Sequence, residues 1–209
     1  MRKIGIMGGT FNPIHNGHLA LAQAAYEYCC LDEVWFMPSG MSYLKEQRDI
    51  VSAKHRLEMT RLAVESISHF SCSDMEICRD GYTYTVDTLR LLHERYPEDT
   101  FYFIMGADSL FGFPNWRCPK EIAALCTLVT VIRDDVDEQK LLAQKTLVEK
   151  TLGANIIMVP FQKISISSSI IREKFSGGLC TADMLPEKVL EYVKKHGLYE
   201  VNNHEASLP

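Results

Sequence analysis

The sequence lacks any uninterrupted apolar run of about 18 residues, so it predicts no membrane-spanning helix. Positive charge is also scarce, because 22 Lys and Arg against 27 Asp and Glu give a net charge of −5. This balance argues against a dedicated nucleic-acid-binding protein, although a local cluster of cations can still hold a phosphate ligand. The strand-like residues 3–7 leave no room for a signal peptide, and none is expected.

Cysteine offers no disulfide framework. The seven cysteines are odd in number, and no two of them form a Cys-x-x-Cys pair. Most lie in apolar stretches, where a free cysteine behaves as a small hydrophobic residue. This usage predicts a reducing, cytoplasmic compartment. The 209 residues can bury a core without disulfides, and we expect one domain over residues 1–200 and a frayed tail at 201–209.

Short and long apolar segments alternate along the chain. The short runs predict strands at 3–7, 33–38, 100–106, 128–133 and 155–160, with a weaker strand pattern at 70–78. The longer ones predict helices at 18–30, 52–68, 84–95, 118–126 and 137–152, and a last helix opens at Pro186 and closes at Gly197. We therefore expect an α/β fold of Rossmann-like, doubly wound type: a mainly parallel sheet with helices on both faces. Ligands of such sheets bind beyond the carboxyl ends of the strands.

Two common phosphate-binding motifs are missing. No glycine loop ends in the Gly-Lys-Ser/Thr of a P-loop, and no G-x-G-x-x-G follows the first strand. The chain is therefore neither a Walker-type NTPase nor an ordinary dinucleotide oxidoreductase. Residues 8–18 read GGTFNPIHNGH instead and stand between an apolar strand and a long helical stretch. Strand, glycine turn and helix aim backbone N–H groups and a helix N-terminus at phosphate.

Two histidines distinguish this turn from a simple phosphate cradle. His15 and His18 are three residues apart, so their rings project from one side of the helix start. Zinc would need a third ligand, and no nearby Glu or Cys gives the H-E-x-x-H spacing. Residues 166–172, ISSSIIR, predict a second anion site: three hydroxyls, on Ser167, Ser168 and Ser169, at a helix N-terminus, with the guanidinium of Arg172.

These motifs resemble those of a known family. The segment 8–18 is similar to the H-x-G-H signature of the nucleotidyltransferase superfamily, and its long form resembles the bacterial nicotinate-nucleotide adenylyltransferases. ISSSIIR resembles that family's I-S-S-T-x-I-R. TYTVDTL at 83–89, the strand-ending GAD at 106–108, Trp116 and residues 185–199 match further family stretches. One departure follows Pro38, where the family usually reads P-x-x-x-P-P-H-K: Lys45 is kept, but Ser42, Tyr43 and Leu44 replace the two later prolines and the histidine.

The resemblance implies transfer of AMP from ATP to nicotinate mononucleotide, giving deamido-NAD and pyrophosphate, with Mg²⁺ carried by ATP and no protein metal site. We expect these substrates as partners, with homo-oligomer formation left open and no nucleic acid or membrane. His15, His18 and Arg172 are the implied catalytic residues, and Lys45, Thr85, Trp116 and Thr10 the implied nicotinate-nucleotide contacts. The implied ATP contacts are Gly8, Gly9, Thr10, Phe11, Gly106, Asp108, Arg133, Ser167, Ser168 and Ser169.

Two other functions remain open at this stage. The same machinery suits another phosphate acceptor, such as nicotinamide mononucleotide or phosphopantetheine. A non-catalytic nucleotide sensor would keep the cradle without turnover, although the intact histidine, serine and arginine set argues against it. Some of these residues also have a purely structural interpretation. Trp116 could be a core residue, Thr85 or Asp108 could cap a helix, and Arg133 could form a surface ion pair.

Overall fold

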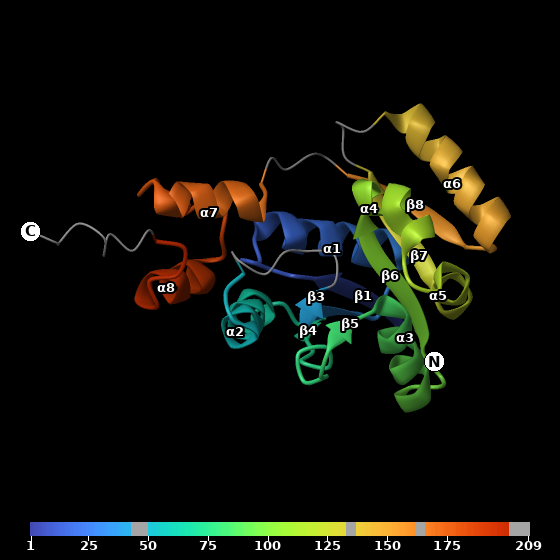
Figure 1. The fold of residues 1–209 in the computed structure, drawn as a ribbon, viewed down its shortest axis with the longest axis horizontal. Coiled ribbons are helices and arrows are strands. Elements are labelled where there is room, and N and C mark those ends of the chain that lie inside the picture. The colour runs from blue at the N-terminus through green and yellow to red at the C-terminus, as the bar shows by residue number, and fades with distance from the viewer. Residues whose placement is uncertain (43–49, 133–136, 162–165, 201–209) are drawn as a thin grey trace, which may run out of the picture.

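Six parallel strands build the main sheet of the computed structural model, which describes residues 1–42, 50–132, 137–161 and 166–200. In spatial order they are β4 (Phe70–Cys72), β2 (Glu33–Pro38), β1 (Lys3–Gly9), β6 (Thr100–Gly106), β7 (Thr127–Ile132) and β8 (Ile156–Pro160). The chain winds outward from β1 through β2 to β4, then returns to β6 and continues through β7 to β8 (Figure 1). The sheet is therefore doubly wound, and its winding direction reverses between β1 and β6.

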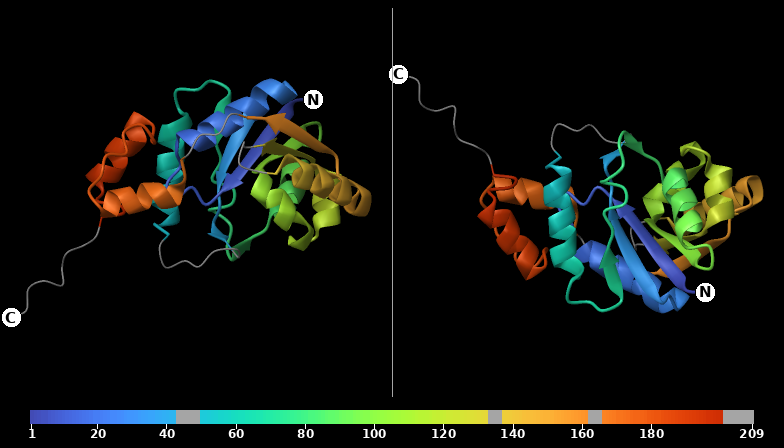
Figure 2. Two further views of the ribbon diagram at one scale, coloured as in Figure 1. Left: turned by 90° about the horizontal axis from the view of Figure 1, so that it is seen from above. Right: turned by 90° about the horizontal axis from the view of Figure 1, so that it is seen from below.

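Helices cover both faces of the sheet. One core contains side chains of α1 (Asn16–Cys29), α2 (Ala53–Val64), α7 (Ser168–Ser176) and α8 (Glu187–Lys195). The other core contains side chains of α3 (Thr85–Arg95), α4 (Ala107–Gly112), α5 (Pro119–Leu125) and α6 (Glu138–Leu152). Figure 2 shows α7 and α8 beside α2 at one end of the molecule and α6 at the opposite end. A short 3₁₀ turn, η1 (Phe113–Asn115), follows α4, and a small parallel pair joins β3 (Met41–Ser42) to β5 (Tyr82–Thr83).

The central strands bury both of their faces. In β1, Ile4 and Ile6 belong to the core beneath α3–α6, whereas Met7 belongs to the core beneath α1. Successive side chains of a strand point to opposite faces, so such a strand must be apolar at nearly every position. This explains why the continuous apolar runs correctly predict the strands, and it confirms the expected fold class.

Several elements differ from the prediction. Helix α2 ends at Val64 rather than at 68, because the N–H of Ile67 bonds to the Val64 carbonyl in a turn. The weak strand pattern at 70–78 yields only the three residues of β4. The six-residue helix α4 was not predicted, since it is shorter than the periodicity that marks a helix in sequence. The predicted tail 201–209 lies outside the described residues.

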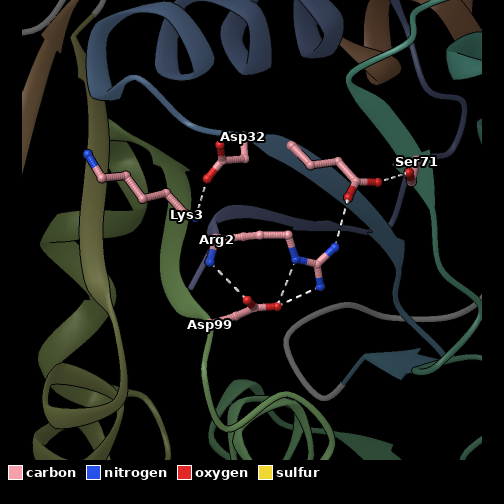
Figure 3. Close-up of polar contacts among 6 residues, drawn as sticks. Arg2, Lys3, Asp32, Ser71 and Asp99 are labelled. Carbon is pink, nitrogen blue, oxygen red and sulfur yellow. Dashed lines mark hydrogen bonds and ion pairs between the residues drawn. The ribbon is translucent and has the colours of Figure 1, made fainter.

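An ion-pair network ties the amino ends of the strands together, opposite the end that carries the motifs (Figure 3). The Arg2 guanidinium donates two hydrogen bonds to the Asp99 carboxylate, from Nε at 3.1 Å and from Nη2 at 2.6 Å. This contact holds the pKa of Asp99 below its ordinary value. Arg2 also lies 3.8 Å from Glu33, which accepts a hydrogen bond from Ser71. The network thus links β1, β2, β4 and the loop before β6.

The cysteines are free thiols, but their placement partly contradicts the sequence interpretation. Cys29 and Cys126 are buried and behave as core residues. Four others are exposed, so the expectation that most cysteines pack as small hydrophobic residues is wrong; they are Cys30, Cys78, Cys118 and Cys180. Among the described helices none is long and apolar enough to cross a bilayer.

Candidate active site

The glycine turn folds back on itself directly after β1. Phe11 has a φ of +49°, in the left-handed region, and its ring covers Gly9. A Cβ on Gly9 would stand 2.8 Å from that ring, so any side chain there would displace Phe11. Asn12 and Pro13 form the turn that the sequence predicts. Gly9 is therefore needed for packing within the turn as well as for access to its backbone.

The two histidines lie together at the start of α1. Their rings stack with centroids 3.7 Å apart, and the Phe11 ring meets His18 edge-on at 5.1 Å. His15 is only 6% exposed. A Cβ on Gly17 would stand 3.0 Å from His15 Nδ1, so a glycine at this position leaves room for the His15 ring. The prediction that both imidazoles project from one side of the helix start is confirmed.

A hydrogen bond determines the tautomer of a neutral His18, and burial determines the charge of His15. The backbone N–H of His15 donates to His18 Nδ1 at 3.2 Å. A neutral His18 therefore carries its proton on Nε2 and has an Nε2–H donor. Burial lowers the pKa of His15 to about 4, so this imidazole is neutral at pH 7. A neutral His15 avoids the repulsion that two stacked imidazolium ions would suffer.

Helix α7 brings the second motif against the first. Ser167 is its N-cap and accepts a hydrogen bond from the N–H of Ile170. Ser168 Oγ donates to the Pro13 carbonyl at 2.9 Å, and Arg172 Nη1 donates to the Asn12 carbonyl at 2.9 Å. Two segments about 155 residues apart in sequence are thus joined by two hydrogen bonds, at the carboxyl ends of the strands.

A cavity of about 770 Å³ opens where these segments meet. It lies at the carboxyl ends of β1 and β6, where the winding of the sheet reverses. Of the predicted site residues, those that line it are Gly8, Gly9, Thr10, Phe11, His15, His18, Thr85, Gly106, Asp108, Trp116, Ser167, Ser168, Ser169 and Arg172. The remaining two, Lys45 and Arg133, lie outside the described residues.

Aromatic side chains line the part of the cavity near Trp116. Trp116 is half-buried, with its ring edge-on to Phe103 at 5.8 Å and tilted against Phe113 at 5.5 Å. Thr85 is the first residue of α3, whose N-cap is Tyr84, so the capping role considered for Thr85 is wrong. The cap of α4 is likewise Gly106, with Asp108 in its first turn. Trp116 therefore packs on Phe103 and Phe113 and also lines the cavity.

Comparison with known proteins places this geometry in a family. The cytidylyltransferase-like family model matches residues 6–174. A Lachnoclostridium phytofermentans protein described as a probable nicotinate-nucleotide adenylyltransferase is 42% identical over 199 residues, which cover 95% of this chain and all of that protein. A Bacillus mycoides protein of the same description is 39% identical and covers 96% of this chain and all of its own. The chain belongs to the nicotinate-nucleotide adenylyltransferase family.

A solved structure supports the same fold. The Plasmodium falciparum nicotinic acid mononucleotide adenylyltransferase complexed with NaAD superimposes with a TM-score of 0.76 at 20% identity, over 95% of this chain and 98% of that chain. At this identity the likeness concerns the fold alone. It agrees with the Rossmann-like, doubly wound sheet found in this family member.

Three residues at or near this cavity were not predicted. Arg56 is 3% exposed, and Glu76 is 7% exposed and lines the cavity. The Arg117 guanidinium lies over the Tyr84 ring at 4.4 Å, next to Trp116 in sequence. The described part of the chain holds no group of three or more His, Cys, Asp or Glu side chains suited to a metal ion.

Glu76 is the buried acid of this site. Burial raises its pKa to about 7, against the smaller opposing effects of the Thr88 hydroxyl, which donates to Oε1 at 2.7 Å, and of Arg79. A carboxyl with a raised folded-state pKa contributes stability below its unfolded pKa of about 4.5, and this stability is lost as pH rises through 7. The neutral amide of Gln does not titrate and avoids this loss.

We expect Glu76→Gln to flatten the pH dependence of stability. Between pH 5 and pH 8 the wild type should lose roughly 2–3 kcal/mol of unfolding free energy relative to the variant, from a shift of more than two pKa units. Urea unfolding at both pH values measures it. Glu94→Gln, at an exposed position on α3, is the control and should follow the wild type. Parallel wild-type and Glu76→Gln curves would contradict a buried, protonated Glu76.

Proposed function

We propose that this chain transfers the adenylyl group of ATP to nicotinate mononucleotide, giving deamido-NAD and pyrophosphate. The observation that carries the proposal is the convergence of the His15–His18 pair and the Ser167–Arg172 segment on one cavity that also contains Thr85 and Trp116. Its volume of about 770 Å³ lies within the range of small-molecule sites. The family relationship supports the same reaction.

The reaction is a direct displacement at phosphorus. A phosphate oxygen of the mononucleotide attacks the α-phosphorus of ATP, and the bond from that phosphorus to the bridging oxygen breaks. The electron pair leaves with pyrophosphate, in line with the attack. Because the attacking phosphate is already an anion at pH 7, the protein needs no general base and forms no covalent intermediate. Its contribution is positioning and the stabilisation of developing charge.

In the proposed reaction each motif has its own part. His18 donates from Nε2 to the α-phosphate, where charge develops. His15 and Arg172 hold the β- and γ-phosphates at the N-terminus of α7, together with the hydroxyls of Ser167 and Ser169, while Ser168 keeps the helix on the Pro13 carbonyl. The turn at Gly8–Phe11 lies at the junction of the two substrates, and Gly106 and Asp108 meet the adenosine. ATP enters as its Mg²⁺ complex, so the metal belongs to the substrate.

The aromatic end of the cavity receives the pyridine ring. Trp116 stacks on the ring, and Thr85 donates a hydrogen bond to its carboxylate. We expect Trp116→Ala to raise the KM for nicotinate mononucleotide about tenfold, the scale of one lost stacking contact. The KM for ATP should change less than twofold, and Trp116→Phe should recover most of the loss. A defect confined to ATP would contradict this placement.

One assay tests the function. Pyrophosphate release from ATP is measured with nicotinate mononucleotide, nicotinamide mononucleotide and phosphopantetheine in parallel. The proposal expects the highest kcat/KM with the nicotinate form. Equal rates, or a preference for the amide or for phosphopantetheine, would reassign the acceptor, and no release with any of them would favour a nucleotide sensor. Homo-oligomer formation stays a prediction, to be read from the mass of the protein in solution.

A further inference from the structure

Arg56 is a buried cation, and its hydrogen-bond partners among the described residues are all neutral carbonyl groups. Its guanidinium donates from Nη1 to the Thr10 carbonyl at 2.8 Å, from Nη2 to the Gly40 carbonyl at 3.2 Å and from Nε to the Val51 carbonyl at 3.2 Å. No carboxylate of the described residues pairs with it, and burial lowers its pKa. Burying an arginine without an acidic partner is costly, so the three carbonyl contacts call for an explanation.

The contact to Thr10 sets the direction of a peptide group in the phosphate-binding turn. A trans peptide is planar, and its N–H points opposite to its C=O. Arg56 is almost wholly enclosed by protein, so the Thr10 carbonyl points inward and the N–H of Phe11 points outward, to the side of the cavity that both residues line. The preceding carbonyl, of Gly9, is held in the same manner by the N–H of Ser39 at 2.8 Å.

The other two contacts tie this turn to the chain that follows β2. Gly40 and Val51 stand on either side of residues 43–49, which include Lys45. Asn12, which belongs to the turn, makes a further contact to Val51, because its Oδ1 accepts a hydrogen bond from the Val51 N–H at 3.2 Å. A Cβ on Gly40 would stand 2.6 Å from the Glu76 carbonyl, so no side chain fits there. Arg56 therefore joins the turn to Gly40 and to Val51 at the same time.

We propose that Arg56 is a positioning residue for adenylyl transfer, whose guanidinium fixes the Thr10 carbonyl and so aims the N–H of Phe11 at the phosphate that reacts. This inference rests on the proposed function. A backbone donor held in place before the reaction stabilises the transition state without the cost of turning at that moment. We therefore expect the loss of Arg56 to slow the chemical step more than it weakens the binding of ATP, because many other contacts also contribute to binding.

Two substitutions at Arg56 test the inference. Arg56→Lys keeps the charge and most of the stem, but a single nitrogen cannot span three carbonyls; Arg56→Met also removes the charge. We expect the rate of a single turnover, with enzyme in excess, to fall at least tenfold in both, and the KM for ATP to stay within about threefold. Arg61→Met is the control, because Arg61 lies on the same helix with a side chain that is 52% exposed.

The wild-type protein provides a measurement that does not depend on a variant's folding. On adding α,β-methylene ATP, the amide signal of Phe11 should shift strongly in a ¹H–¹⁵N spectrum. An amide that does not respond, or a folded Arg56→Lys variant that turns over within threefold of the wild type, would overturn the proposal. A wild type that releases no pyrophosphate would instead refute the proposed reaction, so the two failures are distinguishable.

Discussion

Replacing His18 by alanine should lower kcat by about 10²–10³-fold, the scale for removing one donor aimed at a developing charge. The His15 N–H at His18 Nδ1 leaves Nε2–H as the donor of the neutral ring. The stacked His15 ring and the edge of Phe11 hold that ring in place. Since the donor is fixed before the reaction, its loss should affect kcat more than the KM for either substrate. Steady-state pyrophosphate release measures both constants.

His69→Ala is the matched control for this experiment. His69 also stacks on an aromatic ring, that of Tyr26 at 3.9 Å, and bonds to Gln23, but it does not line the cavity. Its loss should leave kcat unchanged. His18→Gln retains an N–H donor at a different distance from the backbone, so its kcat should lie between those of the wild type and of His18→Ala. A decrease below threefold in His18→Ala would refute the role of His18 in the chemical step.

The parts of the site that the sequence predicted are those encoded locally. A glycine turn after a strand, a histidine three residues from another and a row of serines before Arg172 each specify their own geometry within a few residues. The rule that ligands bind beyond the carboxyl ends of parallel strands then brings these segments together. The meeting of α7 with the turn through Ser168 and Arg172 follows from both steps.

The residues that the sequence did not predict depend on tertiary burial. Arg56 lies in a helix with other charged residues, and in sequence it is indistinguishable from a solvent-exposed arginine such as Arg61. Only the approach of the turn and of residues 40 and 51 buries it. Glu76 gains its raised pKa in the same way, from a loop folded against α3. In both cases the sequence around the charged residue does not show whether its side chain will be buried, because the segments that cover it come from elsewhere in the chain.

Arg172→Met should reduce kcat/KM for ATP by about 10²–10³-fold and leave the KM for nicotinate mononucleotide nearly unchanged. The guanidinium offers five N–H donors, and one of its nitrogens, Nη1, already anchors the side chain on the Asn12 carbonyl. Because Arg172 lines the cavity from the middle of α7, we expect its other donors to reach the triphosphate. Charge-assisted bonds to a leaving pyrophosphate strengthen as the bond to phosphorus breaks, so their loss should affect the transition state more than the ground state.

Two variants separate this role from general charge and from the tether of α7. Arg172→Lys keeps the charge without the planar fork and should recover only part of the loss. Lys174→Met removes a neighbouring charge from the same helix, outside the cavity lining, and should behave as wild type. Ser168 still joins α7 to the Pro13 carbonyl in every case, so the helix keeps one of its two tethers. If Arg172→Met instead raised the KM for the mononucleotide and spared ATP, Arg172 would belong to the acceptor's phosphate, and the orientation of both substrates in the cavity would have to be reversed.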